Sequence, residues 1–194
     1  MRHELATWSR CAILAALAAL MLALPAQSRA GQGTAPQEDA VTVEMVPLSK
    51  SVVVGDTFEI QVMIRAADNP VTGAQAYLNF NPRRLECLEV IPGNTLTDLF
   101  PVPDGPIDNV KGQINFAAGK LLGDAPSGTF ELMTVRLRAL SVTSGTNLSY
   151  STEQPRATTV VGNVGHRYPL LLLESQISAA PGAKVISLPL ILRN

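Results

Sequence analysis

Gly73-Ala-Gln-Ala-Tyr-Leu-Asn-Phe-Asn-Pro-Arg-Arg-Leu-Glu-Cys-Leu-Glu-Val-Ile-Pro-Gly93 is the stretch of this chain that decides its fold. Residues 73–80 alternate between positions for one face and positions for the other, which is the period of a half-buried β-strand. Asn81-Pro82 ends that strand, because proline has no N–H to donate to a sheet. A second apolar strand follows at residues 85–91 and ends at Pro92-Gly93. The stretch predicts a strand, a turn and a strand.

Short β-patterns separated by turn residues continue on both sides of this stretch. They lie at residues 41–45, 51–54, 58–64, 114–118, 130–140, 147–151, 158–161 and 168–173. No amphipathic helical period of useful length accompanies them. Many short strands with regular turn signals are typical of an all-β sandwich or barrel, and we expect an all-β fold.

The N-terminal residues 1–30 have the features of a secretory signal peptide. A basic start is followed by an uncharged Ala/Leu run at residues 11–26, which is shorter than the roughly 20 residues of a membrane-spanning helix. Cleavage is predicted after Ala30 or, alternatively, after Ala26, and an uncleaved anchor is the other interpretation. We therefore expect a secreted protein, extracellular or at the cell surface, that meets a membrane only through the signal peptide during export.

The rest of the chain divides into a linker, a domain and a tail. Residues 31–40 are rich in Gly, Pro, Gln and Ala and are predicted to be a linker, and the domain is placed at residues 41–178. Residues 175–183, which contain Ala-Ala-Pro-Gly, also have linker composition, so residues 179–194 are predicted to be a linker and a short apolar tail. That tail is either a final edge strand or a segment recognised by an export or attachment system.

Charge and cysteine content exclude some classes of protein. The formal net charge is −1 and no basic run is present, so we expect no nucleic-acid partner. Without the signal peptide, Cys87 is the only cysteine, and one cysteine cannot form an internal disulfide. It lies in an apolar strand and is predicted to be packed rather than reactive.

The sequence does not favour an enzyme. His166 is the only histidine outside the signal peptide, no Gly-x-Ser-x-Gly motif is present, and one His with one Cys cannot bind zinc. Glu86 and Glu89 would lie on opposite faces of a regular strand, whereas a glycosidase needs two carboxylates in one cleft. The spacing of Asp104, Asp108 and Asn109 does not fit a calcium loop. We predict no catalytic residue, no metal and no cofactor.

Carbohydrate binding remains an alternative. Sugar-binding platforms usually use exposed flat aromatic side chains, but the chain has no tryptophan outside the signal peptide. Tyr77, on the outer face of its predicted strand, would be a thin platform by itself, while Tyr150 and Tyr168 are further possible contributors. A polysaccharide is therefore kept as the second candidate ligand.

Protein binding is the first candidate function. The predicted outer face of the sheet is flat and mostly uncharged, with one aromatic and two basic side chains, and Tyr and Arg are enriched at binding hot spots. Its expected members are Gly73, Gln75, Tyr77, Asn79, Gln113, Asn115, Arg136 and Arg138. An ordinary solvated sheet face is the alternative. The strand at 130–140 also has apolar side chains on both faces, which predicts either a β-bulge or an exposed apolar patch.

This strand series resembles the cohesin domain over residues 41–178. The matching features are residues 43–47, Val54-Gly-Asp56 and residues 58–64, then Phe80-Asn81-Pro82, the strand at 85–91, Pro92-Gly93, and Gly128-Thr-Phe130 with its long strand. The resemblance implies an antiparallel jelly-roll β-sandwich of about nine strands. It also implies a non-catalytic module that binds a dockerin-like protein and so attaches secreted enzymes to scaffolds for polysaccharide breakdown.

The resemblance also places the binding surface. Cohesins use one sheet face, which includes the strand before the turn. In the type that has an Asn and an Asp there, the matching positions of this chain are Gly73 and Gln75, and both differ. Gly and Gln before an apolar-aromatic strand are similar to the other cohesin type. Related sugar-binding modules share the sandwich, so both candidate ligands stay open.

Overall fold

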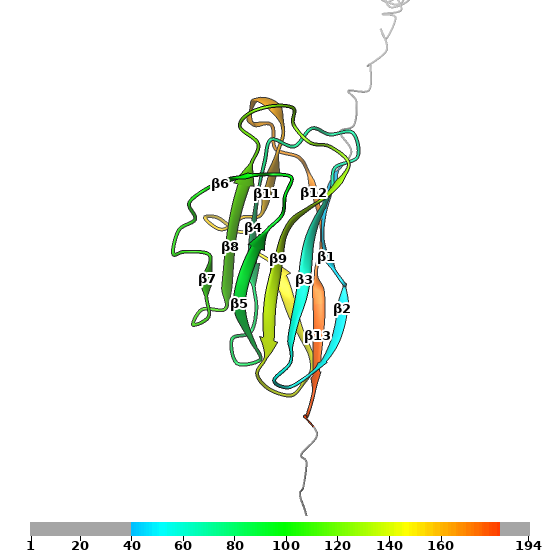
Figure 1. Cartoon of the computed structure of the whole chain (residues 1–194), viewed down its shortest axis with the longest axis vertical. Coiled ribbons are helices and arrows are strands. Elements are labelled where there is room, and N and C mark those ends of the chain that lie inside the picture. The colour runs from blue at the N-terminus through cyan, green and yellow to red at the C-terminus, as the bar shows by residue number, and fades with distance from the viewer. Residues whose placement is uncertain (1–39, 183–194) are drawn as a thin grey trace, which may run out of the picture. The chain divides into compact units, whose positions relative to one another are not determined.

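Residues 40–182, which the computed structural model describes, form a sandwich of two β-sheets (Figure 1). The first sheet has the order β12 (Leu170–Leu173), β1 (Val41–Val46), β3 (Thr57–Arg65), β9 (Thr129–Ala139) and β5 (Leu85–Pro92). The second sheet has the order β2 (Ser49–Val53), β13 (Ser175–Ala180), β10 (Thr143–Tyr150), β4 (Gly73–Asn79), β8 (Gln113–Gly119) and β6 (Asp98–Leu99). Two short strands add to it: β7 (Ile107–Asp108) pairs with β8, and β11 (Thr159–Val161) pairs with β4. The all-β prediction is confirmed.

Strand number and direction differ in detail from the expectation. Residues 40–182 contain thirteen strands rather than about nine, because β6, β7 and β11 are separate pairings of two or three residues. Most pairs are antiparallel, but β12 runs parallel to β1 and β13 runs parallel to β2. The only helical element in this part of the chain is the 3-10 turn Asn163–Gly165, and no helix within it is long and apolar enough to cross a membrane.

The core follows from the alternation in the sequence. On β3, Phe58, Ile60, Val62 and Ile64 point inward and are at most 6% exposed, and on β4 the inward residues are Ala74, Ala76 and Leu78. Burying one large aliphatic side chain contributes about 1.5–3 kcal/mol, so these rows hold the two sheets together. At the end of β4, the side chain of Asn81 accepts a hydrogen bond from the Arg83 N–H at 3.0 Å. This contact confirms the predicted turn.

A β-bulge explains the apolar side chains on both faces of β9. Val62 pairs with Met133 and Met63 pairs with Glu131, so Leu132 is an extra residue between them. The bulge moves Phe130 and Leu132 into the core, where they are 7% and 2% exposed. Of the two interpretations of this strand, the bulge is confirmed and the exposed apolar patch is wrong.

The folded domain extends slightly beyond its predicted end. Residues 175–180 form strand β13, with Ile177 and Ala179 in the core, so the linker composition of 175–183 was misleading. Every second side chain of β13 faces the opposite sheet, so the strand contributes to the core although most of its residues are small. The predicted signal peptide (1–30), nearly all of the first linker (31–40) and the apolar tail lie outside the described residues.

Cys87 is buried on β5, as predicted, and we expect its thiol to be unreactive. It is 2% exposed, and burial raises its pKa to about 12 from 9.0. Because the thiolate is the nucleophile, labelling by a disulfide reagent at pH 8 should be at least about 100-fold slower in the folded protein than in denaturant. The folded pKa is the higher one, so this group's contribution to stability is complete below pH 9 and falls between pH 9 and about 12. Fast labelling without denaturant would contradict the buried placement.

Candidate binding face

The outer face of β4 and β8 brings together six of the eight predicted site residues. Tyr77 pairs with Asn115, Asn79 with Gln113, and Gln75 with Ala117, so their side chains share the face that points away from the core. Gly73 continues the row opposite Gly119. We call this surface the β4–β8 face.

Three members of the β4–β8 face, Gly73, Tyr77 and Asn115, are buried rather than exposed. Tyr77 is 7% exposed and Asn115 is 2% exposed, so the prediction of an open Tyr77 platform is wrong. The connection between β10 and β11, residues 151–158, lies over Tyr77. The Tyr77 N–H donates to the Thr158 hydroxyl at 3.2 Å, and the Tyr77 carbonyl accepts from the Ser151 N–H at 2.7 Å. Gln75 holds the same connection through its amide, which donates to the Ala157 carbonyl at 2.8 Å.

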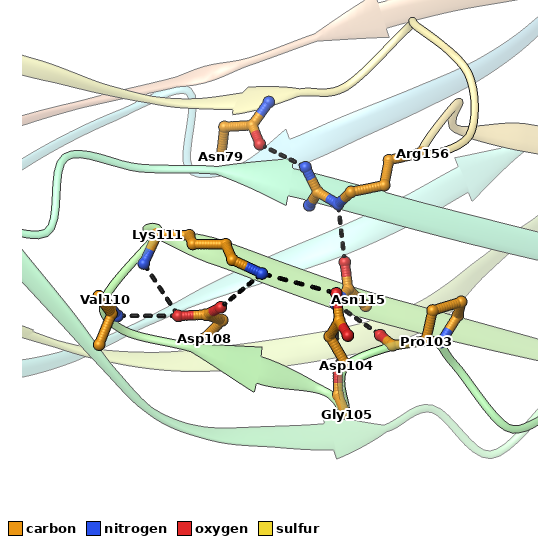
Figure 2. Close-up of polar contacts among 9 residues, drawn as sticks. All are labelled: Asn79, Pro103, Asp104, Gly105, Asp108, Val110, Lys111, Asn115 and Arg156. Atoms are coloured by element: carbon orange, nitrogen blue, oxygen red, sulfur yellow. Dashed lines mark hydrogen bonds and ion pairs between the residues drawn. The ribbon is translucent and has the colours of Figure 1, made fainter.

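Arg156 reaches from this connection to the centre of the face (Figure 2). Its Nη1 donates to the Asn79 side-chain oxygen at 2.7 Å and its Nε donates to the Asn115 side-chain oxygen at 3.0 Å. Its Nη2 donates to the backbone carbonyls of Leu78 at 3.0 Å and Ile114 at 3.4 Å. The guanidinium carbon also lies 5.5 Å from the centre of the Tyr77 ring, within range of a cation–π interaction.

Asn115 ties a second covering segment to the face. Its amide donates to the carbonyls of Pro103 at 3.2 Å and Gly105 at 2.9 Å, so it anchors the loop between β6 and β7 (Figure 2). Asn115 therefore has a structural role, and only its oxygen is directed toward Arg156. Burying an amide is tolerated here because both its donor and its acceptor groups are bonded.

Two adjoining hollows lie beside the covered centre. A mainly apolar hollow of about 370 Å³ is lined by residues of β5, β8 and the β6–β7 loop, and a second of about 200 Å³ is lined by residues of β4, β8 and β11 with Arg167. Phe100 and Ala117 line both. Phe100 directly follows β6 and is 40% exposed, so it forms an apolar ridge between the hollows.

Arg136 and Arg138 do not belong to this face. Both lie on β9 in the first sheet, so the prediction of one surface containing all eight residues is wrong. Arg136 contacts Glu59 at 2.9 Å and Glu89 at 2.5 Å, and Arg138 pairs with Glu86. The hydrogen bond with Glu59 is the main reason that the pKa of Arg136 is raised. The outer surface of the first sheet is thus occupied by its own ion pairs.

A second bulge corrects the expected placement of Glu86 and Glu89. On β5, Cys87 pairs with Leu137 and Glu89 pairs with Arg136, which leaves Leu88 as an extra residue. The bulge brings both carboxylates to the outer face of the first sheet rather than to opposite faces. Each is bound to an arginine, so this pair does not form an open acidic cleft.

The other residues that were considered for catalysis or metal binding make contacts within the domain. Asp108 accepts hydrogen bonds from the N–H groups of Val110 and Lys111, the second of which is the main reason that its pKa is lowered. Asn109 is bonded to the backbone of Cys87. The His166 ring packs edge-on against Tyr168, with ring centres 5.2 Å apart. Within residues 40–182, no group of three or more His, Cys, Asp or Glu side chains is placed to hold a metal ion.

Sequence reasoning missed Arg156 and Phe100. Arg156 lies in a Thr-Glu-Gln-Pro-Arg segment that has no periodicity. Nothing in the local sequence therefore indicates that its side chain reaches β4 and β8. The local sequence does indicate that Phe100 is exposed. It is an aromatic residue between leucine and proline in a loop rich in Pro, Asp and Gly, where few neighbours can bury it.

The sequence of this chain matches a known domain family. The protein-family model described as "Cohesin domain" matches residues 43–165, which is more than half of the chain. No curated protein matches the sequence.

Several solved structures share the fold. CaCohA2 from Clostridium acetobutylicum superposes with a TM-score of 0.61 at 14% identity, covering 74% of this chain and 92% of that one. The third cohesin of ScaC from Acetivibrio cellulolyticus, solved in complex with the ScaB dockerin, gives 0.60 at 10% identity, covering 72% and 98%. A cohesin module from a Clostridium perfringens family 33 glycoside hydrolase gives 0.60 at 16% identity, covering 74% and 98%.

Proposed function

This chain belongs to the cohesin-domain family, and from that premise we propose that it binds a dockerin-type protein in an extracellular assembly linked to polysaccharide breakdown. Cohesin modules are non-catalytic binding domains, and this one is not an enzyme. Its similarity to a cohesin solved with a bound dockerin supports the partner class. We further propose that residues 1–30 direct its secretion.

One observation supports the β4–β8 face as the binding surface. The outer surfaces of the two sheets differ in whether their side chains already have partners within the domain. The first sheet presents arginines already paired with glutamates. The β4–β8 face instead is bordered by two hollows, the larger of which reaches to β5 of the first sheet, and by the exposed side chain of Phe100. Aromatic side chains next to hollows that a partner can fill are typical of binding hot spots, whereas exposed ion pairs contribute little to binding energy.

The structure gives less support to a polysaccharide ligand. Tyr77, Tyr150 and Tyr168 are all at most 8% exposed, so none offers an open ring for stacking on a sugar. Among residues 40–182, Phe100 is the one large aromatic side chain that is clearly exposed. A single phenylalanine ridge suits an apolar protein side chain better than a row of sugar rings.

The proposed function predicts calcium-dependent protein binding. Purified proteins with duplicated calcium-loop dockerin repeats, encoded by the same organism, would be titrated into residues 31–194 in a calorimeter. We expect at least one to bind with a dissociation constant of about 1 μM or tighter, in line with stable protein interfaces. Chelating calcium should abolish binding, because dockerin loops need the ion to fold.

Two controls decide what a negative or positive result means. Arg138→Gln, on the opposite sheet, should leave the affinity unchanged, and a large loss would move the binding face to the first sheet. Insoluble cellulose, xylan and chitin would be tested in parallel. Retention on a glycan together with no dockerin binding would overturn the proposed partner in favour of the carbohydrate alternative.

A further inference from the structure

We infer that Arg156 is a specificity position that binds a carboxylate of the protein partner, an Asp or Glu side chain placed over the centre of the β4–β8 face. The inference rests on the proposed function and deepens it by naming a chemical feature that the partner must present.

The first argument is the missing countercharge. All four atoms that accept hydrogen bonds from Arg156 are neutral: the side-chain oxygens of Asn79 and Asn115 and two backbone carbonyls. No carboxylate in residues 40–182 lies within ion-pair distance of it. By contrast, Arg65, Arg136 and Arg138 on the first sheet each contact a glutamate. A guanidinium stays charged at neutral pH, so Arg156 carries a positive charge without a direct ion-pair partner.

The second argument is partial burial. Arg156 is half-buried, and desolvation is the main reason that its pKa is lowered. A charge that has lost water without gaining an opposite charge is less stable than a paired one. A partner carboxylate would restore that interaction, and in a closed interface it would act through a lower dielectric than water.

The third argument is geometry. The four contacts, two of which are drawn in Figure 2, hold the planar guanidinium in one orientation between β4 and β8, so little side-chain entropy remains to be lost on binding. Nη1 carries two hydrogens, and one contact uses only one of them. The second is available to an incoming oxygen, which is the arrangement that charge-assisted hydrogen bonds require.

The surroundings favour a single carboxylate over a polyanion. Asp104, in the β6–β7 loop, and Asp108, at the end of β7, both pair with Lys111, at 3.6 and 3.4 Å (Figure 2), and Glu153 is exposed three residues before Arg156. These acids would repel a nucleic acid or a highly charged glycan. One carboxylate on an otherwise apolar protein surface can reach Arg156 while avoiding them.

The test is a set of Arg156 variants measured against the dockerin that binds the wild-type protein. Arg156→Gln should weaken binding about 10- to 30-fold, and Arg156→Lys, which keeps the charge, should weaken it only about 3-fold. Arg83→Gln removes an exposed charge elsewhere and should change nothing. Partner Asp and Glu residues would be replaced with Asn and Gln one at a time, and one replacement should have no further effect in the Arg156→Gln background.

A purely structural role for Arg156 predicts a different pattern. If Arg156 only holds the 151–158 connection in place, the Lys and Gln variants should lose affinity equally and no partner carboxylate should be coupled to it. That result would overturn the inference while leaving dockerin binding intact.

A second measurement does not need the dockerin. Sodium acetate would be titrated against a sodium chloride control while the Arg156 Nε–H signal is followed by NMR. A saturating shift at Arg156 but not at Arg136, together with no dockerin binding, would support the carboxylate site and overturn the partner class. No specific shift would overturn the inference even if a dockerin binds.

Discussion

Replacing Gly112 with alanine is expected to lower the free energy of unfolding by about 3 kcal/mol, because two separate costs meet at this residue. Gly112 has φ +69°, a left-handed conformation that a side chain disfavours. A Cβ atom there would lie 2.1 Å from the Phe80 carbonyl oxygen and 2.8 Å from the Pro82 ring. The ring is part of the Asn81-Pro82 turn and the oxygen belongs to the residue just before it, so the clash would disturb the turn that ends β4. Urea denaturation would measure the loss as a lower midpoint with an unchanged slope.

Gly128 provides the matched control. It has φ +77°, but nothing lies within 4 Å of the position of its Cβ. Gly128→Ala therefore carries the backbone cost without the clash and should lose only about 1 kcal/mol. Equal losses in the two variants would show that the close approach of Gly112 to Phe80 has no energetic consequence.

Phe100→Ala is expected to weaken dockerin binding about 100-fold while leaving the fold intact. Phe100 lines both hollows beside the β4–β8 face and is 40% exposed, so its removal merges the hollows and deletes the apolar ridge between them. Aromatic anchors of this kind cost 2 kcal/mol or more when truncated, by the usual behaviour of hot spots. Calorimetric titration would give the affinity, and thermal unfolding would check that the variant is folded.

Leu171→Ala serves as its control. Leu171 is also apolar and 52% exposed, but it lies on β12 at the edge of the first sheet. Its truncation should leave the dissociation constant within about twofold. If both variants bind like wild type, the partner does not use the hollows, and the proposed face would have to be replaced.

The strands were predictable because their signals are local. Alternation over five to nine residues decides which side chains of β1, β3, β4 and β8 face the core, and Asn81-Pro82 marks a turn without help from distant residues. The C-terminal strand β13 was missed because its Ser and Ala residues lack the bulk that usually marks a strand.

The binding face was only partly predictable because it depends on which strands become neighbours. Asn115 and Arg136 were predicted to share a surface, but the chain crosses from one sheet to the other between β8 and β9. Tyr77 and Asn115 were assigned to the correct face of their strands. Their burial comes from the two connections that cross over them, and hydrogen bonds to the sheet, rather than any periodic pattern, position those connections.

The parallel pairs β1–β12 and β2–β13 affect the order in which the module can be completed during synthesis. The first two strands acquire these partners only after some 120 further residues have been made, because β12 begins at Leu170. Until then β1 and β10 each have one open edge, and open edges can pair with other chains. Such distant pairings also slow folding, typically to milliseconds or longer. A chain stopped before Leu170 would thus leave β1 and β10 uncovered and β2 unpaired, whereas in the complete domain β12 covers β1, and β13 covers β10 and pairs with β2.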